Sequence, residues 1–318
     1  MATITTTQTQ QRSAELNVLA RKQRSLWLDA WYRLRRNRAA MAGLVVIGIA
    51  CLVAIFAPVI APHDPTAQDT PNQLMDPFFV SSKFKMDQYP LGSDQLGRDI
   101  LSRLIWSSRV SMLVGFVPIM LVFLIGVTIG MVAGYNGGWV DNLLMRFTDI
   151  VYAFPDLLLL FIIMAMLRNT AAGDLMGGLV LIFVAIAIVS WVGMARLVRG
   201  QVLSLKEREF IEAARAIGAR PKRIMIRHLF PNILAPIIVS VAFGIPSAML
   251  AEAVLSFFGI GIKPPTATWG VMINEGFAVV STTGWHVIFP AFCISIVMLA
   301  FTFVGDGLRD ALDPRMKL

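Results

Sequence analysis

The sequence is poor in charged residues, cysteine and histidine. Asp, Glu, Lys and Arg make up 15% of its 318 residues, whereas a soluble domain has about a quarter. Hydrophobic residues make up 56%, and the mean hydropathy is +0.68. A disordered chain is also excluded, because disorder requires low hydrophobicity. The class that remains is a polytopic helical membrane protein.

Residue types that build metal centres and covalent active sites are scarce. The two cysteines, Cys51 and Cys293, lie in apolar runs, and the three histidines, His63, His228 and His286, lie in different segments. We therefore expect neither a disulfide framework nor a metal cluster. The sequence also lacks a G-x-x-x-x-G-K-[ST] phosphate loop, a G-x-S-x-G elbow and an H-E-x-x-H pair. We expect no cofactor in this chain, no catalytic residue and no enzyme activity of its own.

Six apolar stretches are each long enough to cross a hydrocarbon core of about 30 Å as a helix. They cover residues 40–61, 110–133, 143–167, 178–195, 233–260 and 287–304. The third is interrupted at Phe154-Pro155-Asp156, where the proline removes a backbone N–H and predicts a structural kink. The first stretch is too long for the apolar part of a signal peptide, so we expect a retained anchor.

Lys and Arg are distributed unevenly along the chain. The tail before residue 40 holds eight, residues 196–232 hold nine and the C-terminal tail holds three. The segments on the opposite side hold seven, with Arg146 left aside. Cytoplasmic loops retain Lys and Arg, so both termini and residues 196–232 are predicted to be cytoplasmic. We take this excess as the reason for the net charge of +8, and expect no nucleic-acid partner.

The expected organisation follows from these spans and charges. It comprises a cytoplasmic tail 1–39, a first transmembrane helix 40–61, an extracytoplasmic loop 62–108, a core of five transmembrane helices 109–308 containing a cytoplasmic loop 201–232, and a cytoplasmic tail 309–318.

Three acidic residues, Asp149, Asp156 and Glu252, lie within apolar stretches. Asp149 is three residues after Arg146, a spacing that predicts an ion pair on one helix face. The role of Glu252 stays open between helix packing, pathway lining and proton relay. The apolar composition therefore leaves two hypotheses of function open at this point: an ion-coupled secondary transporter with Glu252 as its relay, and a membrane scaffold without transport activity.

The longest cytoplasmic loop, residues 205–232, carries the most informative pattern. One helical face, at i, i+3, i+4 and i+7 spacing, is formed by Phe210, Ala213, Ala214 and Ile217. Gly218 then suits a helix C-cap, and Pro221 and Pro231 are expected to open and close a second short helix. The residues alone allow docking into a groove of a partner or contact with anionic lipid headgroups.

This loop resembles the EAA loop of ABC importer permeases. The pattern reads Glu212-Ala213-Ala214, then Gly218, then His228-Leu229-Phe230-Pro231-Asn232. The His-x-x-Pro-Asn ending is similar to the dipeptide, oligopeptide and nickel subgroup, where the general family form has Ile and Leu at the positions of His228 and Phe230. Further stretches similar to the second, C-type permease of that subgroup are 90–103, 141–155, 255–270 and 305–315.

The resemblance implies a type I ABC importer permease fold with six transmembrane helices in a prokaryotic plasma (inner) membrane. The implied partners are a second permease, two ATPase subunits that carry the ATP and Mg, an extracytoplasmic substrate-binding protein and membrane lipid. Peptides are the implied substrate, with nickel chelates or oligosaccharides as alternatives. Glu212 is expected to enter the ATPase groove and Gly218 to set the elbow of the loop. The full implied coupling set is Phe210, Glu212, Ala213, Ala214, Ile217, Gly218, His228 and Pro231.

Overall fold

The computed structural model describes residues 26–80 and 89–313, and within them it contains helices and loops but no strands. In chain order the elements are α2 (Leu26–Arg36), α3 (Arg38–Ile60), η1 (Thr70–Asn72), α4 (Ile100–Asn136), α5 (Gly138–Tyr152), α6 (Asp156–Leu167), α7 (Ala171–Asp174), η2 (Leu175–Gly178), α8 (Leu179–Leu205), α9 (Glu209–Ala216), α10 (Pro221–Ile224), η3 (a π-helical turn, Met225–Leu229), α11 (Phe230–Phe257), α12 (Trp269–Phe277) and α13 (Trp285–Leu312).

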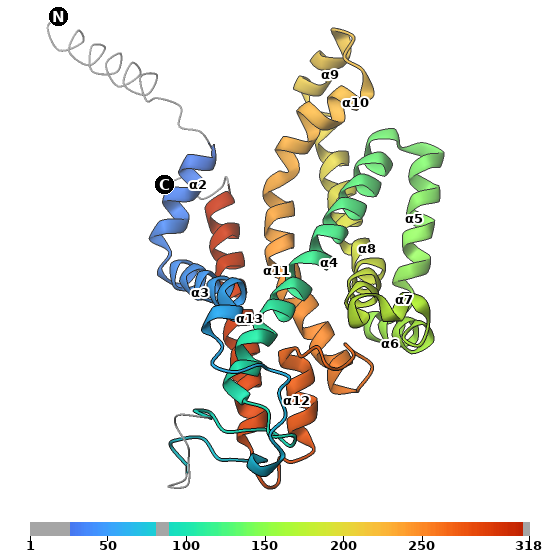
Figure 1. The fold of residues 1–318 in the computed structure, drawn as a ribbon. Coiled ribbons are helices and arrows are strands. Elements are labelled where there is room, and N and C mark those ends of the chain that lie inside the picture. Colours follow the sequence, from blue (N-terminus) through green and yellow to red (C-terminus); the bar gives the residue numbers. More distant parts are fainter. Residues whose placement is uncertain (1–25, 81–88, 314–318) are drawn as a thin grey trace, which may run out of the picture.

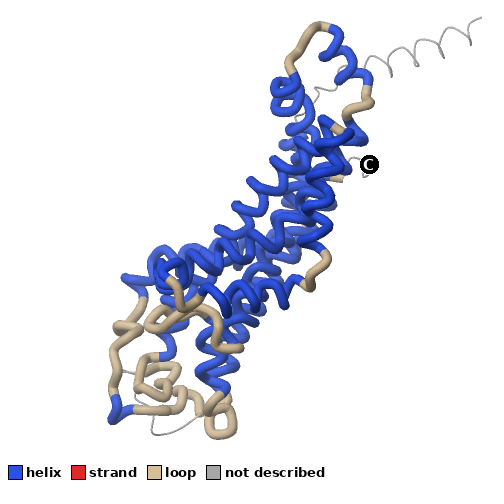
Figure 2. Tube along the Cα trace, turned by 90° about the vertical axis from the view of Figure 1, so that its right-hand side faces the viewer, coloured by secondary structure: helices blue, strands red, loops and turns tan. Residues whose placement is uncertain are grey.

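The helices form an elongated bundle with loops at its two ends (Figures 1 and 2). The α9–α10 pair lies at one end. The long connection between α3 and α4 lies with α12 at the other (Figure 1). Five helical segments of the described residues are long and apolar enough to cross a membrane, and the bent pair α5–α6 counts as a sixth. The expected all-α fold with six spans is therefore confirmed.

The kink expected in the third span is present and large. The axes of α5 and α6 differ by 80°, and Pro155 occupies the position directly before α6. The proline has no N–H to donate to the preceding turn, so the helix ends and restarts. The span therefore changes direction where an uninterrupted helix would continue.

α4 packs along α8, and small residues allow the close approach. Gly126, Gly130 and Gly134 follow each other at one-turn spacing on the α4 face that meets α8. A Cβ on Gly130 would lie 2.4 Å from the backbone oxygen of Ala195 and 2.8 Å from Cβ of Val198. Membrane helices gain little from hydrophobic association, so close packing of this kind contributes to holding α4 and α8 together.

The predicted ion pair between Arg146 and Asp149 is wrong. The Asp149 carboxylate instead lies 2.7 Å from Nη2 of Arg196 on α8. One turn away on α8, Arg199 forms two hydrogen bonds of 2.5 and 2.7 Å with the carboxylate of Asp141 on α5. The spacing rule considers contacts within one helix only. The guanidinium groups of Arg196 and Arg199 on the antiparallel helix α8 lie within hydrogen-bonding distance of the α5 carboxylates. These pairs fasten α5 to α8.

The second span begins earlier than its hydropathy indicates. α4 starts at Ile100, ten residues before the apolar stretch, because Asp99 caps it by accepting from the backbone N–H groups of Leu101 and Ser102. The first turns contain the buried polar residues Arg103 and Ser107, which lower the local hydropathy. The capping residue Asp99 therefore indicates where this helix starts, although the low hydropathy of its first turns hides the start from a hydropathy search.

Candidate functional site

The cytoplasmic loop forms a helical hairpin whose corner is Gly218. α9 ends at Ala216, and Gly218 follows with φ of +78°. The N–H of Gly218 bonds to the oxygen of Arg215 at 2.9 Å, and the N–H of Ala219 bonds to the oxygen of Ala214 at 3.0 Å. These two bonds define a Schellman motif, which places a left-handed residue after the helix. The C-cap expected at Gly218 is thus present.

The apolar residues of α9 are divided between the protein interior and the surface. Ile211 and Ala214 are buried. Phe210 and Ile217 are 42% and 85% exposed, and Glu212 and Ala213 are exposed between them. The predicted four-residue face is therefore not a single contact surface, because only Ala214 of that set packs inward. We call the outward residues Phe210, Glu212, Ala213 and Ile217 the α9 outer face.

Pro231 does not close the second helix of the loop, contrary to the prediction. α10 continues through the π-helical turn η3 into α11, so residues 221–257 form one helical segment. Pro231 lies in the first turn of α11, directly after the π turn, and the helical backbone continues past it. His228 lies within η3, and its backbone oxygen accepts from the Asn232 side chain at 2.6 Å. The corner at Gly218 is therefore joined directly to a membrane span.

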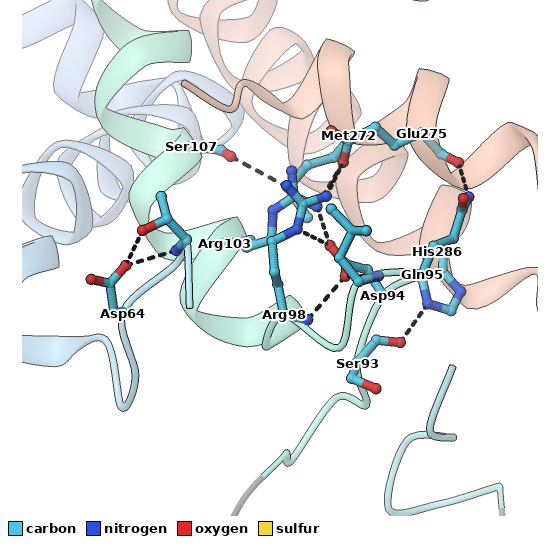
Figure 3. Close-up of polar contacts among 12 residues, drawn as sticks. Asp64, Ser93, Asp94, Gln95, Arg98, Arg103, Ser107, Met272, Glu275 and His286 are labelled. Atoms are coloured by element: carbon cyan, nitrogen blue, oxygen red, sulfur yellow. Dashed lines mark hydrogen bonds and ion pairs between the residues drawn. The ribbon is translucent and has the colours of Figure 1, made fainter. Parts of the chain in front are cut away.

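A buried ion cluster lies at the opposite end of the bundle, which Figure 3 shows. Asp94 accepts from Nε of Arg98 at 2.6 Å and from Nη1 of Arg103 at 2.5 Å. The same two guanidinium groups lie 2.9 and 2.7 Å from Glu275 on α12. Burial opposes ionisation of Asp94, but Arg103 and Arg98 outweigh it and hold the pKa of this carboxyl below its ordinary value. The four residues form the outer ion cluster.

The outer ion cluster fastens the α3–α4 connection to α12. His286 supports it, because Nε2 lies 2.8 Å from the backbone oxygen of Ser93 and Nδ1 lies 2.6 Å from Thr283 Oγ1. A cavity of about 280 Å³ lies beside Asp94, Arg103, Glu275 and His286. Sequence reasoning identified the 90–103 stretch but missed Glu275, which is 172 residues further along than Arg103 and carries no local signal. These contacts hold the α3–α4 connection against α12, which is a structural role.

The contacts of Glu252 favour one of its three open roles. Its side chain is buried and accepts from Ser256 Oγ at 2.6 Å and from Thr268 Oγ1 at 2.7 Å. Thr268 Oγ1 also accepts from the N–H of Val271 in the first turn of α12. Glu252 therefore joins α11 to the start of α12, which is a packing role. In the described part of the chain, no group of three or more His, Cys, Asp or Glu residues could hold a metal ion.

Comparisons with known proteins place this geometry in a family. Residues 126–318 match the family described as "Binding-protein-dependent transport system inner membrane component". Residues 25–77 match "N-terminal TM domain of oligopeptide transport permease C". Among solved structures, the chain is similar to the MetNI methionine ABC transporter in inward facing conformations. That likeness has a TM-score of 0.48 and 20% identity, and covers 67% of this chain and 96% of that one.

Curated relatives match nearly the whole chain. The dipeptide transport system permease protein DppC of Bacillus subtilis (strain 168) is 40% identical and covers 97% of this chain and 92% of its own. The oligopeptide transport system permease protein OppC of the same organism is 38% identical, covering 94% and 93%. OppC of Escherichia coli (strain K12) is 38% identical, covering 92% of both. The resemblance seen in the cytoplasmic loop is confirmed: this chain belongs to the family of inner membrane components of binding-protein-dependent ABC importers, with the type I permease fold.

Proposed function

We propose that the chain forms half of the translocation pathway of an ATP-driven importer of dipeptides and oligopeptides. The relatives that match over nine-tenths of the chain are named for dipeptide and oligopeptide transport, which favours peptides over nickel chelates and oligosaccharides. The observation that carries the coupling mechanism is the α9 outer face, exposed beside a corner that leads directly into a span. An ion-coupled transporter is not favoured, because Glu252 is engaged in packing.

The proposed assembly contains a second, related permease, two ATPase subunits and an extracytoplasmic binding protein. ATP and Mg bind to the ATPase subunits. The binding protein delivers the peptide to the end that carries the outer ion cluster. Both chain termini and the α9–α10 end face the cytoplasm, in agreement with the excess of Lys and Arg there.

The α9 outer face suits insertion into a groove of the ATPase. Ile217 and Phe210 supply apolar area that lacks cover in this chain, and the small side chain of Ala213 between them permits close approach. Glu212 places a carboxylate at the edge of this apolar area. When the ATPases close on ATP, they move α9, and the rigid corner at Gly218 transmits that movement to the 221–257 helix. His228 and Pro231 lie on this helix, where it leaves the loop and enters the span.

The test is purification of the tagged chain from its native membranes under conditions that preserve complexes. We expect the second permease, an ATPase and the binding protein to accompany it, and the purified assembly to take up peptide with ATP and without an ion gradient. Uptake that follows the ion gradient and ignores ATP would refute the proposal.

The variant Ile217→Asp tests the docking face itself. An aspartate in place of an 85% exposed isoleucine leaves this chain's own packing intact, but puts a charge into the apolar contact. We expect the ATPase to be lost from the purified assembly. Val280→Asp, which adds the same charge at an exposed apolar position near α12, is the matched control and should retain the ATPase.

A further inference from the structure

A groove between the spans, lined mostly by apolar residues and by a few polar ones, is used by none of the features above. It has a volume of about 420 Å³ and walls from α4, α6, α8 and α11. Its polar lining is Asp156, Ser190, Ser240 and Ser247. Along α11 the lining runs from Ser240 to Val254, which corresponds to about 21 Å at the α-helical rise. The groove thus follows much of the depth of a hydrocarbon core of about 30 Å.

Asp156 is the one ionisable side chain that lines this groove. It is exposed at the start of α6, directly after the 80° bend. α5 separates it from the α4–α5 corner by fifteen residues, or about 22 Å, so the carboxylate lies at membrane depth. Among the described residues no hydrogen bond or ion pair engages it. An ionised group there is costly unless a cation or a watery passage accompanies it.

The N-terminus of α6 does not by itself explain how an ionised Asp156 is stabilised. A helix N-terminus carries only a partial positive charge, which is weaker than a full counter-charge. The two other acids near the α5–α8 contact, Asp141 and Asp149, each have an arginine within 2.7 Å. Asp156 is different because the lining of its groove includes three serine hydroxyl groups and no cation.

The rest of the groove suits a small donor-rich ligand. Ser247 Oγ donates to the backbone oxygen of Phe243 at 3.0 Å, which leaves its lone pairs free to accept. Ser190 is exposed on α8, and beside it a Cβ on Gly193 would meet nothing within 4 Å. An ammonium group has three donors and no acceptor. A carboxylate and hydroxyl oxygens that line the same groove are suitable partners for such a group.

We propose that this groove is the wall that the chain contributes to the translocation pathway, and that Asp156 receives the α-ammonium group of a peptide in transit. The serine hydroxyls accept the remaining N–H donors as the peptide moves along α11. This inference rests on the peptide import proposed above and adds the residue that contacts the substrate. It makes a free amino terminus a requirement of passage through the membrane, separate from any selection by the binding protein.

The test is uptake of radiolabelled dialanine and trialanine by the assembled transporter in proteoliposomes with internal ATP. Asp156→Asn preserves shape and removes the charge, and we expect it to lower uptake about tenfold or more, as loss of a charge-assisted hydrogen bond would. Asp156→Glu should retain most of the uptake. Asp174→Asn is the matched control: its carboxylate is paired with Lys263 at 2.7 Å and does not line the groove, so uptake should be unchanged.

A second measurement separates a pathway from a contact with the other permease. In a chain with Cys51 and Cys293 replaced by serine, Ser247→Cys should react with a cationic methanethiosulfonate in the assembled transporter, and peptide should slow the reaction. If the second permease fills the groove, this cysteine reacts only in the isolated chain, and the inference is overturned. Wild-type uptake by an Asp156→Asn transporter that assembles normally also overturns the inference. A wild-type assembly that takes up no peptide with ATP instead refutes the proposed function.

Discussion

Replacing Gly218 by alanine is expected to uncouple ATP hydrolysis from transport while leaving the assembly intact. Gly218 has φ of +78°, and a Cβ built on it would meet no atom within 4 Å. The cost of the substitution is therefore confined to the backbone, and a Cβ in the left-handed region costs about 1–2 kcal/mol. An energy of this size reduces the population of the native corner about 5- to 30-fold. Because α9 ends there and the 221–257 helix begins nearby, the α9 outer face is misplaced relative to the span.

The assay is the ratio of peptide imported to ATP hydrolysed by the assembled transporter in proteoliposomes, with complex recovery measured in parallel. Asparagine tolerates the left-handed conformation better than alanine, and β-branched residues tolerate it least. We therefore expect the ratio to fall in the order Gly, Asn, Ala, Val at position 218. A Gly218→Val assembly with the wild-type ratio would refute the reasoning, since no contact exists to compensate the strain. Equal loss of complex in all variants would instead indicate a folding defect.

Two further predictions concern stability. Gly130→Leu should lower the melting temperature of the detergent-solubilised chain, since overpacking costs about 1–3 kcal/mol and a Cβ there would lie 2.4 Å from the Ala195 oxygen; Gly48→Leu, with nothing within 4 Å, should not, and equal effects would contradict the packing argument. The lowered pKa of Asp94 means that its ion pairs stabilise the fold above the unfolded pKa of about 4. This stabilisation is lost as the pH falls through the folded pKa. The melting temperature of Asp94→Asn should therefore change less between pH 6 and pH 2.5 than that of the wild type. An unchanged pH dependence would show that Asp94 does not carry it.

One helical segment connects the two ends of the bundle. The 221–257 segment runs from the corner at Gly218 to Phe257, where Glu252 joins it to Thr268 at the start of α12. α12 in turn carries Glu275 of the outer ion cluster. A movement of α9 imposed by the ATPases would therefore reach α12 through this helical segment and the buried hydrogen bonds of Glu252. This arrangement provides the coupling proposed above with a physical route.

The residues themselves predicted the features that depend on local chemistry. Apolar length determined the six spans, because a helix in lipid satisfies its own backbone. Pro155 and the polar Asp156 after it predicted the bend of the third span, because they interrupt its apolar run where the backbone also lacks an N–H. Gly218 determined the corner, because a positive φ is a property of one residue. The EAA-like loop identified the family, and the comparisons confirmed it.

Only the tertiary structure decided which way each helix faces and which partners meet. Ile211 rather than Phe210 packs inward, because the rotation of α9 depends on the corner that follows it. Asp149 pairs with Arg196 on a neighbouring helix, and Glu275 meets arginines distant in the chain. The groove at Asp156 combines residues of four helices. Sequence periodicity describes each helix about its own axis, whereas these contacts depend on rotations and separations between helices, which arise only when all of them pack.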